Sequence, residues 1–344
     1  MPNRIADLRS DTVTRPDSPM YAAMVSATVG DDIHGDDPSV NELQERFASL
    51  VGKEAALFVP SGSMGNSIAI TAWTRRGDEV IIPSECHIFR YECGSASFLA
   101  GVELVEVDSS TGAPDPAEVR RRYKSGGFHS SRSSLLTFEN THNYRGGLVS
   151  PKCLLEEAAA FARENGMQIH MDGARLWNAS IATGQSMAEL ASVSDSVMCC
   201  LSKGLGCPVG SLLAGPADFI GEAKRLRKIF GGSMRQAGVL AGAGIYAIGH
   251  NFSRLAEDHA RAKRLAATLG ELPWAELDLE MVHTNIVIAQ VPGRQAQLVQ
   301  ELAEKRGIRL FALNDYEIRL VTHKDVNDED INHAVDVLAS LKVT

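Results

Sequence analysis

The feature that most constrains the fold is an alternation of short apolar segments with longer helical segments through the first two thirds of the chain. The short segments favour strands, as in "EVIIPS" (79–84) and "VELVEVD" (102–108). The longer segments favour helices, as in "SVNELQERFASLVG" (39–52) and "LLEEAAAFARENG" (154–166). Strands that alternate with helices pair in parallel, and the helices cover both faces of their sheet. The sequence therefore predicts an α/β fold with a mostly parallel central sheet.

The strand pattern continues and then changes near residue 251. Further strand segments are expected at 54–62, 133–140, 167–174 and 196–204. Beyond them a long charged helix, "RLAEDHARAKRLAATLGEL", precedes the strand segments "TNIVIAQV" and "EIRLVTH", with the helix "AQLVQELAEKRG" between these two. A chain of 344 residues usually forms about two domains. We expect a large domain of residues 1–250, including the N-terminal segment, and a smaller α+β domain of residues 251–344.

The charge argues against two classes of partner. The formal net charge is −9 and the sequence pI is near 5.6. An acidic chain is a poor generic ligand for nucleic acid or for an anionic membrane, so neither is expected as a partner. The basic stretch "KRLRKIFGGSMR" (224–235) can still bind a phosphate locally, although the solvated face of a helix explains it equally well.

The cysteines and the N-terminus indicate a cytoplasmic protein. The six cysteines form no C-x-x-C motif, and no histidine pair has the spacing of a zinc site, so no metal is expected. Six cysteines in a chain of this length fit reduced thiols better than a disulfide framework. The start "MPNRIADLRSDTVTRP" has no apolar signal core, and no run approaches the roughly 18 apolar residues of a membrane span.

Three groups with chemical potential follow predicted strands. Asp172 ends the strand "MQIHMD", and Lys203 follows "SVMCCLS" on a loop with several glycines. The triplet Ser-Gly-Ser at 61–63 follows "EAALFVP" and opens a segment that is expected to be helical. Ligands of open parallel sheets bind outside the carboxyl ends of the strands. A helix N-terminus with glycine and hydroxyl residues also presents N–H groups to an anion such as a phosphate.

Together the three groups meet the requirements of pyridoxal phosphate. That cofactor needs a phosphate cradle, a carboxylate beside its pyridine nitrogen, and a lysine that attacks its carbonyl carbon. Each group also has an ordinary explanation: a strand-end Asp often caps a helix, Ser-Gly-Ser often forms only a turn, and a lysine on a glycine loop is often only solvated. Competing motifs are absent: "GAGIYAIG" lies within a helical run, and the chain has no G-x-S-x-G elbow, P-loop or H-E-x-x-H.

Longer motifs carry a family resemblance. They are, in order, "DLRSDTVTRP", "GDDIHGDDPSVNELQ", "GKEAALFVPSGSMGN", "ENTHN", "HMDGARLWNA", "CLSKGLGCPVGSLLAG", "GGSMRQAG" and "EIRLVTHKDV". The chain resembles the L-threonine aldolase family of pyridoxal-phosphate enzymes, from about Asp7 to Val326. The resemblance implies the aspartate-aminotransferase-like fold, fold type I.

The same resemblance implies an activity and an assembly. Members cleave L-threonine, L-allo-threonine and other β-hydroxy-α-amino acids to glycine and an aldehyde, through an external aldimine and retro-aldol cleavage of the Cα–Cβ bond. They form homo-oligomers, dimers or tetramers, with sites at the subunit interface. Two alternatives stay open: another pyridoxal-phosphate reaction, such as β-elimination or transamination, and a non-enzymatic binding protein that has kept the fold.

The resemblance also implies roles for individual residues. Lys203 would bind the cofactor covalently, Asp172 would pair with the ring nitrogen, and His87 would stack on the ring. The implied catalytic residues are Lys203, His87, His142 and Asp172. The implied cofactor-binding residues are Gly62, Ser63, Met64, His87, Asp172, Arg175, Lys203 and Arg235, the last from the adjoining subunit. The implied substrate-binding residues are Ser10, Arg175, Arg319 and His34, and arginine suits a carboxylate because its fork binds both oxygens.

His34 departs from the family pattern. The family reads G-D-D-V-Y-G-(D/E)-D, and this chain has His34 in place of the tyrosine. We expect this position to face the site of a neighbouring subunit. An imidazole is shorter than a phenol and titrates near neutrality. Substrate preference and pH profile are therefore the properties in which this chain is expected to differ from its family.

Overall fold

The predicted strand segments form one large sheet. The computed structural model describes residues 5–343. The strands of the sheet are β2 (Ala55–Val59), β3 (Glu79–Pro83), β4 (Glu103–Val107), β6 (Ser130–Glu139), β7 (Gln168–Asp172), β8 (Ser196–Cys200) and β9 (Ser211–Gly215). They lie in the order β2-β9-β8-β7-β6-β3-β4. The pairs β3–β4, β3–β6, β6–β7 and β7–β8 are parallel, so the prediction of a mostly parallel α/β sheet is confirmed.

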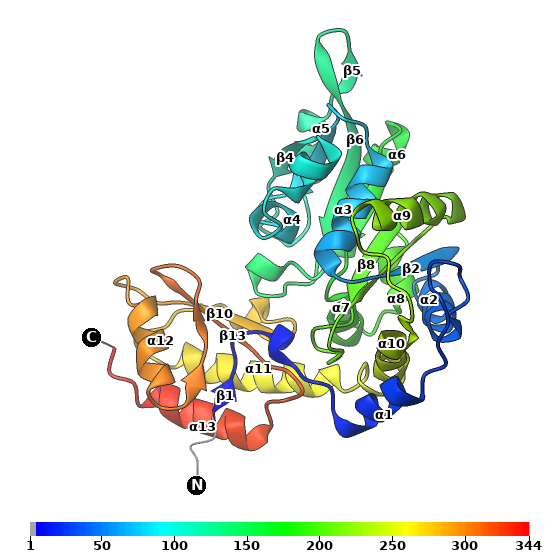
Figure 1. The fold of residues 1–344 in the computed structure, drawn as a ribbon. Coiled ribbons are helices and arrows are strands. Elements are labelled where there is room, and N and C mark those ends of the chain that lie inside the picture. The colour runs from blue at the N-terminus through cyan, green and yellow to red at the C-terminus, as the bar shows by residue number, and fades with distance from the viewer. Residues whose placement is uncertain (1–4, 344) are drawn as a thin grey trace.

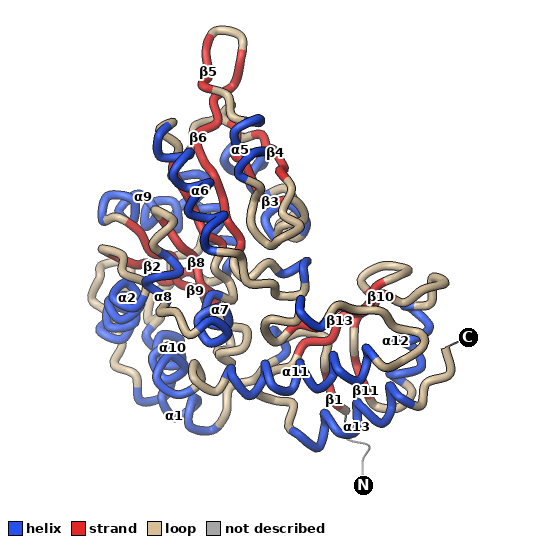
Figure 2. The backbone as a smooth tube through the Cα atoms, turned by 180° about the vertical axis from the view of Figure 1, so that it is seen from behind, coloured by secondary structure: helices blue, strands red, loops and turns tan. Residues whose placement is uncertain are grey.

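Two strands of this large sheet were not predicted. β9 runs antiparallel to both β2 and β8. β5 (Ser125–Gly127) pairs antiparallel with the start of β6. The resulting hairpin projects from the body, at the top of both views (Figures 1 and 2). Phe128 lies at its turn and is 97% exposed.

Helices cover both faces of the sheet. The covering helices include α2 (Pro38–Leu50), α3 (Gly62–Trp73), α6 (Lys152–Glu164), α7 (Leu176–Thr183), α9 (Ala217–Ile229) and α10 (Gly238–His250). Successive side chains of β2 show the two sides. Phe58 packs in the cluster that contains Phe47 of α2, whereas Leu57 packs with Ile68 of α3 and Phe219 of α9. This division follows from the two-residue repeat of a strand.

Shorter elements complete this part of the molecule. They are the 3-10 helix η1 (Asp11–Val13), α1 (Ser18–Ser26), α4 (His87–Arg90), the π-helix η2 (Ala96–Ala100), α5 (Pro116–Arg122), the 3-10 helix η3 (Asn143–Arg145) and α8 (Met187–Ala191). Among residues 5–343, no helix combines the length and the apolar composition that a membrane crossing requires. All six cysteines are in the described part of the chain, as free thiols.

The C-terminal third forms a second, smaller α+β body. Its elements are α11 (Leu255–Gly270), the 3-10 helix η4 (Leu279–Met281), β10 (Ile286–Gln290), α12 (Ala296–Glu304), β11 (Ile308–Arg309), β12 (Phe311–Ala312), β13 (Glu317–Val321) and α13 (Asp328–Ala339). β10, β13 and β12 form an antiparallel sheet with its own apolar core. The body lies beside the large sheet, at lower left in Figure 1.

The N-terminal segment contacts this smaller body. β1 (Ala6–Asp7) pairs in parallel with β11, and the amide of Val321 donates to the carbonyl of Leu8. Ala6 and Leu8 are buried in the apolar core of the smaller body. The boundary expected between residues 250 and 251 stays a prediction.

Candidate active site

The three groups that follow predicted strands come together in one pocket. It has a volume of about 120 Å³ and receives residues from the β2–α3 turn, from α3 and α4, and from the ends of β7 and β8. The lining residues are Ser61, Gly62, Ser63, Asn66, His87, Glu92, Asp172, Ala174, Met198, Cys200, Ser202 and Lys203. The convergence of parallel strand ends explains why groups so far apart in sequence meet here.

The start of α3 has the features of a phosphate cradle. Ser61 caps the helix, and its side chain accepts a hydrogen bond from the amide of Met64 at 3.2 Å. A Cβ on Gly62 would lie 2.8 Å from Cys200 Sγ, so a larger residue would displace the wall of the pocket. The amides of the first helical turn have no partner within the helix, and the helix dipole favours an anion beside them.

Asp172 and Lys203 enter the pocket from neighbouring strands. Asp172 is 1% exposed, and its Oδ2 accepts from Asn66 Nδ2 at 2.9 Å while its Oδ1 accepts from the amide of Ala174 at 3.0 Å. Lys203 is half-buried, and its backbone carbonyl accepts from Thr14 Oγ1 at 2.9 Å. This bond fixes the loop of Lys203 while leaving its amine free to face the pocket.

His87 lies across the pocket at the start of α4 and is paired with a buried carboxylate. Its Nδ1 is 2.9 Å from Oε1 of Glu92. Burial alone would lower the pKa of His87, but the hydrogen bond to Glu92 and the charge of Asp172 outweigh it and raise that pKa. Burial also raises the pKa of Glu92, against the opposing effect of His87. The pair therefore fixes the orientation of the imidazole and leaves its Nε2 available.

His142 is buried just after β6 with one free nitrogen. Its Nε2 is 3.1 Å from the carbonyl oxygen of Ser84, which can only accept, so this nitrogen carries a hydrogen. Its Nδ1 has no hydrogen-bond partner although it is shielded from water. A neutral His142 thus presents an unused lone pair. His142 does not line the pocket described above.

The two predicted arginines differ in what they already bind. Arg175 donates from Nε and Nη2 to the two oxygens of Asp11, at 2.7 Å each, and from Nη1 to Asn143 Oδ1 at 3.1 Å. Arg319 donates to the carbonyl of Arg9 at 3.3 Å, and its Nε is buried without a partner. Burial and the positive charge of Arg175 lower the pKa of Arg319.

Two further predicted residues, Ser10 and Met64, do not line the pocket. Ser10 is buried and caps η1, with its Oγ 2.8 Å from Thr12 Oγ1. Met64, on the first turn of α3, packs against Gly232, where a Cβ would lie 2.2 Å from Met64 Sδ.

His34 and Arg235 both lie on the surface. The His34 side chain is 69% exposed and its Nε2 is 4.0 Å from Oδ2 of Asp31. Arg235 pairs with the same oxygen at 2.8 Å. The two residues are therefore neighbours, as a shared site requires, but they do not join the pocket of their own chain.

Asn66 and Glu92 were not predicted, although their side chains bond to predicted residues of the pocket. Asn66 is four residues after Gly62 on α3, so one turn of helix places both on the same face. That spacing is a signal that could have identified Asn66. Glu92 follows α4 in an irregular segment, where Cys93 has a positive φ of 54°, and no sequence pattern indicates its direction.

The pocket also contains a possible set of cation ligands. Ligand atoms of His87, Glu92 and Asp172 lie within 4.8 Å of one another. Asn66 donates to both carboxylates from one amide nitrogen, at 2.8 and 2.9 Å, and a hydrogen-bond donor in that place opposes a cation. The arrangement suits a group that needs a carboxylate acceptor better than it suits a metal.

The residues present fit pyridoxal phosphate, the cofactor that the resemblance implies. A cradle that a Cβ would obstruct, a buried carboxylate and a lysine amine face the same space. They are the three groups that a phosphate, a pyridine nitrogen and a carbonyl carbon require.

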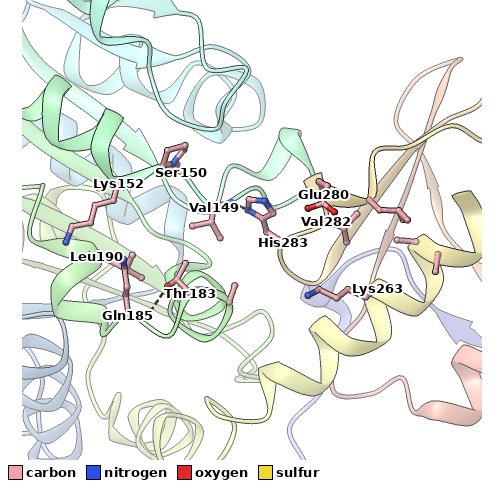
Figure 3. Close-up of a pocket in the computed structure, with 15 residues that line it drawn as sticks. Val149, Ser150, Lys152, Thr183, Gln185, Leu190, Lys263, Glu280, Val282 and His283 are labelled. Atoms are coloured by element: carbon pink, nitrogen blue, oxygen red, sulfur yellow. Dashed lines mark hydrogen bonds between the residues drawn. The ribbon is translucent and has the colours of Figure 1, made fainter.

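A larger cavity of about 730 Å³ lies elsewhere, between α6, α7 and α8 on one side and α11 and η4 on the other (Figure 3). Its lining includes Lys152, Lys263, Glu280 and His283, and His283 Nδ1 accepts from the amide of Val149 at 3.1 Å. None of the predicted site residues lines it. Volume alone is therefore a poor guide to the chemistry of this molecule.

Comparison with known proteins agrees with the geometry. The family model described as beta-eliminating lyase matches residues 7–292. The chain is 43% identical over 326 residues to the low specificity L-threonine aldolase of Escherichia coli strain K12, covering 94% of this chain and 96% of that protein. It is 39% identical over 348 residues to low-specificity L-threonine aldolase 1 of Arabidopsis thaliana, covering 99% and 97% of the two chains.

Solved structures show the same fold. The threonine aldolase of Leishmania major superposes with a TM-score of 0.81 at 20% identity, covering 97% of this chain and 98% of that one. Identity at that level supports the fold alone, whereas the two sequence relatives and the family model extend over nearly the whole chain. The chain therefore belongs to the low-specificity L-threonine aldolase family, within the beta-eliminating lyases.

Proposed function

We propose that the protein is a pyridoxal-phosphate-dependent aldolase, a carbon–carbon lyase, that cleaves L-threonine and L-allo-threonine to glycine and acetaldehyde. Other β-hydroxy-α-amino acids would give glycine and the corresponding aldehyde. The observation that carries the proposal is the convergence of Lys203, Asp172 and the start of α3 in one pocket. The names of the E. coli and Arabidopsis relatives supply the substrate class.

Different residues would bind different parts of the cofactor. The amides of Gly62 and Ser63 would hold the phosphate, and the amide of Met64 would join them by leaving the Ser61 side chain to which it donates. Asp172 would keep the pyridine nitrogen protonated, and Lys203 would form the covalent link. When bound, the cofactor accepts the electron pair that is left on Cα when the Cα–Cβ bond breaks. Asp172 suits its role because it is buried and its other contacts are donors, so the carboxylate faces the pocket as an acceptor.

Recognition of the substrate carboxylate is assigned mainly to Arg319. Its buried Nε has no partner, whereas Asp11 already occupies the fork of Arg175. The nearby charge of Arg175 still adds to the attraction for an anion. A substrate carboxylate at Arg319 also offsets the repulsion between the two cations.

The proton of the substrate hydroxyl requires a base within hydrogen-bond reach. His142 offers an unpartnered Nδ1. His87 offers Nε2, but its raised pKa favours the protonated form, which is a donor. His87 lines the pocket, so we assign to it the stacking and proton-donating roles. His142 does not line the pocket, so we assign it the base role through one bound water.

The proposal includes a homo-oligomer, a dimer or a tetramer, in the cytoplasm. Tyr21, Val25 and Val29 expose apolar side chains along α1 and the residues after it, and Val239 does so on α10. His34 lies after α1 and Arg235 lies before α10, so an interface formed here would carry both toward a neighbouring subunit. The free thiols of all six cysteines are consistent with a reducing compartment.

Product analysis tests the function. The purified protein loaded with pyridoxal phosphate is incubated with L-threonine, L-allo-threonine and phenylserine, and glycine and aldehyde are measured together. Equimolar glycine and aldehyde support the proposal. A keto acid with ammonia from the same substrates would establish β-elimination, the alternative favoured by the description of the family model. A protein that binds no cofactor and releases no product would be a binding protein that has kept the fold.

A further inference from the structure

We propose that Asn66 is a positioning residue that holds Asp172 and Glu92 in one orientation. We also propose that His170 fixes Asn66 by donating to its amide oxygen, on the side away from the two carboxylates. The inference rests on the proposed function, because Asp172 and His87 are the groups that this function places around the cofactor. Neither Asn66 nor His170 would touch the reacting atoms. Both act through the carboxylates.

The contacts of Asn66 determine the direction of its amide. Asn66 is fully buried on α3, and its Nδ2 lies 2.8 Å from Glu92 Oε1 and 2.9 Å from Asp172 Oδ2. Carboxylate oxygens accept, so the amide nitrogen must face them and uses both of its hydrogens there. The amide oxygen therefore faces the other way, toward Nε2 of His170 at 3.1 Å.

The same logic determines the tautomer of His170. The amide oxygen of Asn66 can only accept, so Nε2 of His170 carries a hydrogen. Burial lowers the pKa of His170 to about 4, against the opposing charge of Asp172, so the ring is neutral near pH 7. Its Nδ1 then has no hydrogen and accepts from Ser196 Oγ, 2.9 Å away.

The chain of contacts ends at a tryptophan. The Ser196 oxygen accepts from the indole nitrogen of Trp73 at 2.9 Å. An indole N–H only donates. In each hydrogen bond from Trp73 to the two carboxylates, the member nearer Trp73 is therefore the donor. We call Trp73, Ser196, His170 and Asn66 the donor relay. Every member has its partner, and reversing any one bond would leave buried polar atoms unsatisfied.

The donor relay has a function beyond packing. Two carboxylates share this small buried space, and one amide group hydrogen-bonds both of them. Asp172 is thereby held with a fixed oxygen toward Asn66, and Glu92 is held where its Oε1 also meets Nδ1 of His87. Loss of the relay would let both carboxylates rotate or take up a proton. The cofactor would then lose its acceptor and its stacking imidazole together.

Three variants and one control test the relay. Asn66→Asp keeps the shape but cannot donate to both carboxylates. His170→Leu removes the donor to Asn66, whereas His170→Gln restores one, because its amide nitrogen can occupy the place of Nε2. Asn165→Ala is the control: Asn165 Nδ2 donates to the carbonyl of Phe161 at the end of α6, and Asn165 does not line the pocket.

The primary measurement is the affinity of each unloaded protein for pyridoxal phosphate, followed by absorbance, with circular dichroism as a check on folding. We expect Asn66→Asp and His170→Leu to weaken the affinity by about tenfold or more, as lost hydrogen bonds to charged groups do. His170→Gln should recover most of the loss, and Asn165→Ala should match the parent. The relay would be overturned if Asn66→Asp and His170→Leu bound the cofactor within about twofold of the parent affinity. It would also be overturned if His170→Gln bound the cofactor as weakly as His170→Leu.

A second measurement separates this inference from the proposed function. Nitrogen-15 NMR of the unloaded parent reports which nitrogen of His170 carries the hydrogen, without any variant or cofactor. Hydrogen on Nε2 supports the relay, and hydrogen on Nδ1 overturns it. If the parent binds the cofactor and releases glycine, and the variants bind the cofactor as tightly as the parent, the relay alone is disproved. If the parent binds no pyridoxal phosphate, the proposed function is disproved, and the NMR result alone then tests the relay.

Discussion

The guanidinium of Arg175 and the carboxylate of Asp11 form a buried bidentate ion pair, with two hydrogen bonds of 2.7 Å. Arg175 is 5% exposed and Asp11 is fully buried. Removing one member of such a pair leaves an uncompensated charge inside the protein, which typically costs about 3–5 kcal/mol. Asn285 also donates to Asp11, at 3.2 Å, so the pair joins η1 to α7 and to the smaller body.

Asp11→Asn should lower the free energy of unfolding near pH 7. It should also make that free energy fall less steeply as the pH is lowered. Burial alone would raise the pKa of Asp11, but the charge and hydrogen bonds of Arg175 outweigh it and hold that pKa far below the usual value of 3.8. A depressed pKa contributes stability that is complete above about pH 4 and is lost as the pH falls further. Urea unfolding from pH 7 to pH 2 measures both effects. Parallel curves for parent and variant would contradict the prediction.

Lys203→Ala should abolish the covalent link to pyridoxal phosphate and reduce cleavage of threonine by on the order of a thousandfold or more. The fold should persist, because Lys203 contacts Thr14 through its backbone carbonyl rather than its side chain. Absorbance of the bound cofactor and the rate of glycine release are the measurements. Lys263→Ala, in the larger cavity, is the matched lysine control. Near-normal turnover in Lys203→Ala would assign the link to another residue.

Asp172→Ala should weaken cofactor binding and slow cleavage, because a ring nitrogen without its proton is a poorer acceptor of electrons. The expected loss in kcat is about 10²- to 10³-fold, the size of a preorganised electrostatic contact. Asp172→Asn keeps the shape and should lose a similar factor in kcat with a smaller loss of affinity. An unchanged rate at full cofactor occupancy would refute the role of Asp172.

Glu92→Gln should lower the pKa of His87. Burial lowers that pKa, and in the parent the hydrogen bond to Glu92 and the charge of Asp172 reverse the effect. Without the Glu92 carboxylate, the imidazole should lose its proton at a lower pH than in the parent. An NMR titration of His87 in the unloaded protein reports the change. Because His87 is assigned as the proton donor, the basic limb of the pH–rate profile should also move to lower pH. A titration that moves to higher pH would show that Glu92 does not stabilise the imidazolium.

His34→Tyr, which restores the residue of the family pattern, should change the Michaelis constant or the pH profile without changing the reaction. The exposed His34 lies beside Asp31 and Arg235, in the group of residues expected to face a neighbouring site. His34→Ala should weaken cofactor retention more than His34→Tyr does. The measurements are cofactor affinity, pH profile and the rate ratio of threonine to allo-threonine. If both variants match the parent in all three, His34 is only a surface residue.

Residues at strand ends could be predicted because their location depends on a local signal. Asp172, Lys203 and the turn at 61–63 each follow a short apolar run, and parallel strands bring such ends to one edge of the sheet. The predicted mostly parallel sheet and the smaller α+β body follow from equally local patterns.

Other features depend on long-range geometry that no local pattern records. Asp11 pairs with a residue 164 positions away, and the direction of Glu92 depends on a left-handed turn at Cys93. The antiparallel β9 is a five-residue run after a glycine-rich loop, and nothing in those residues specifies the direction of pairing. Arg175 was predicted to bind the substrate carboxylate because the family resemblance implies that role, and the sequence does not show that Asp11 occupies its fork.

The N-terminal strand has a consequence for the order in which the molecule can assemble. Asp7 accepts through its carbonyl from His323, 316 residues later, while Thr14 holds the loop of Lys203. The ribosome makes Asp7 316 residues before His323. Asp7 must therefore wait without this partner until those residues have been made. Contacts of such long sequence separation form slowly, and this strand closes late in folding.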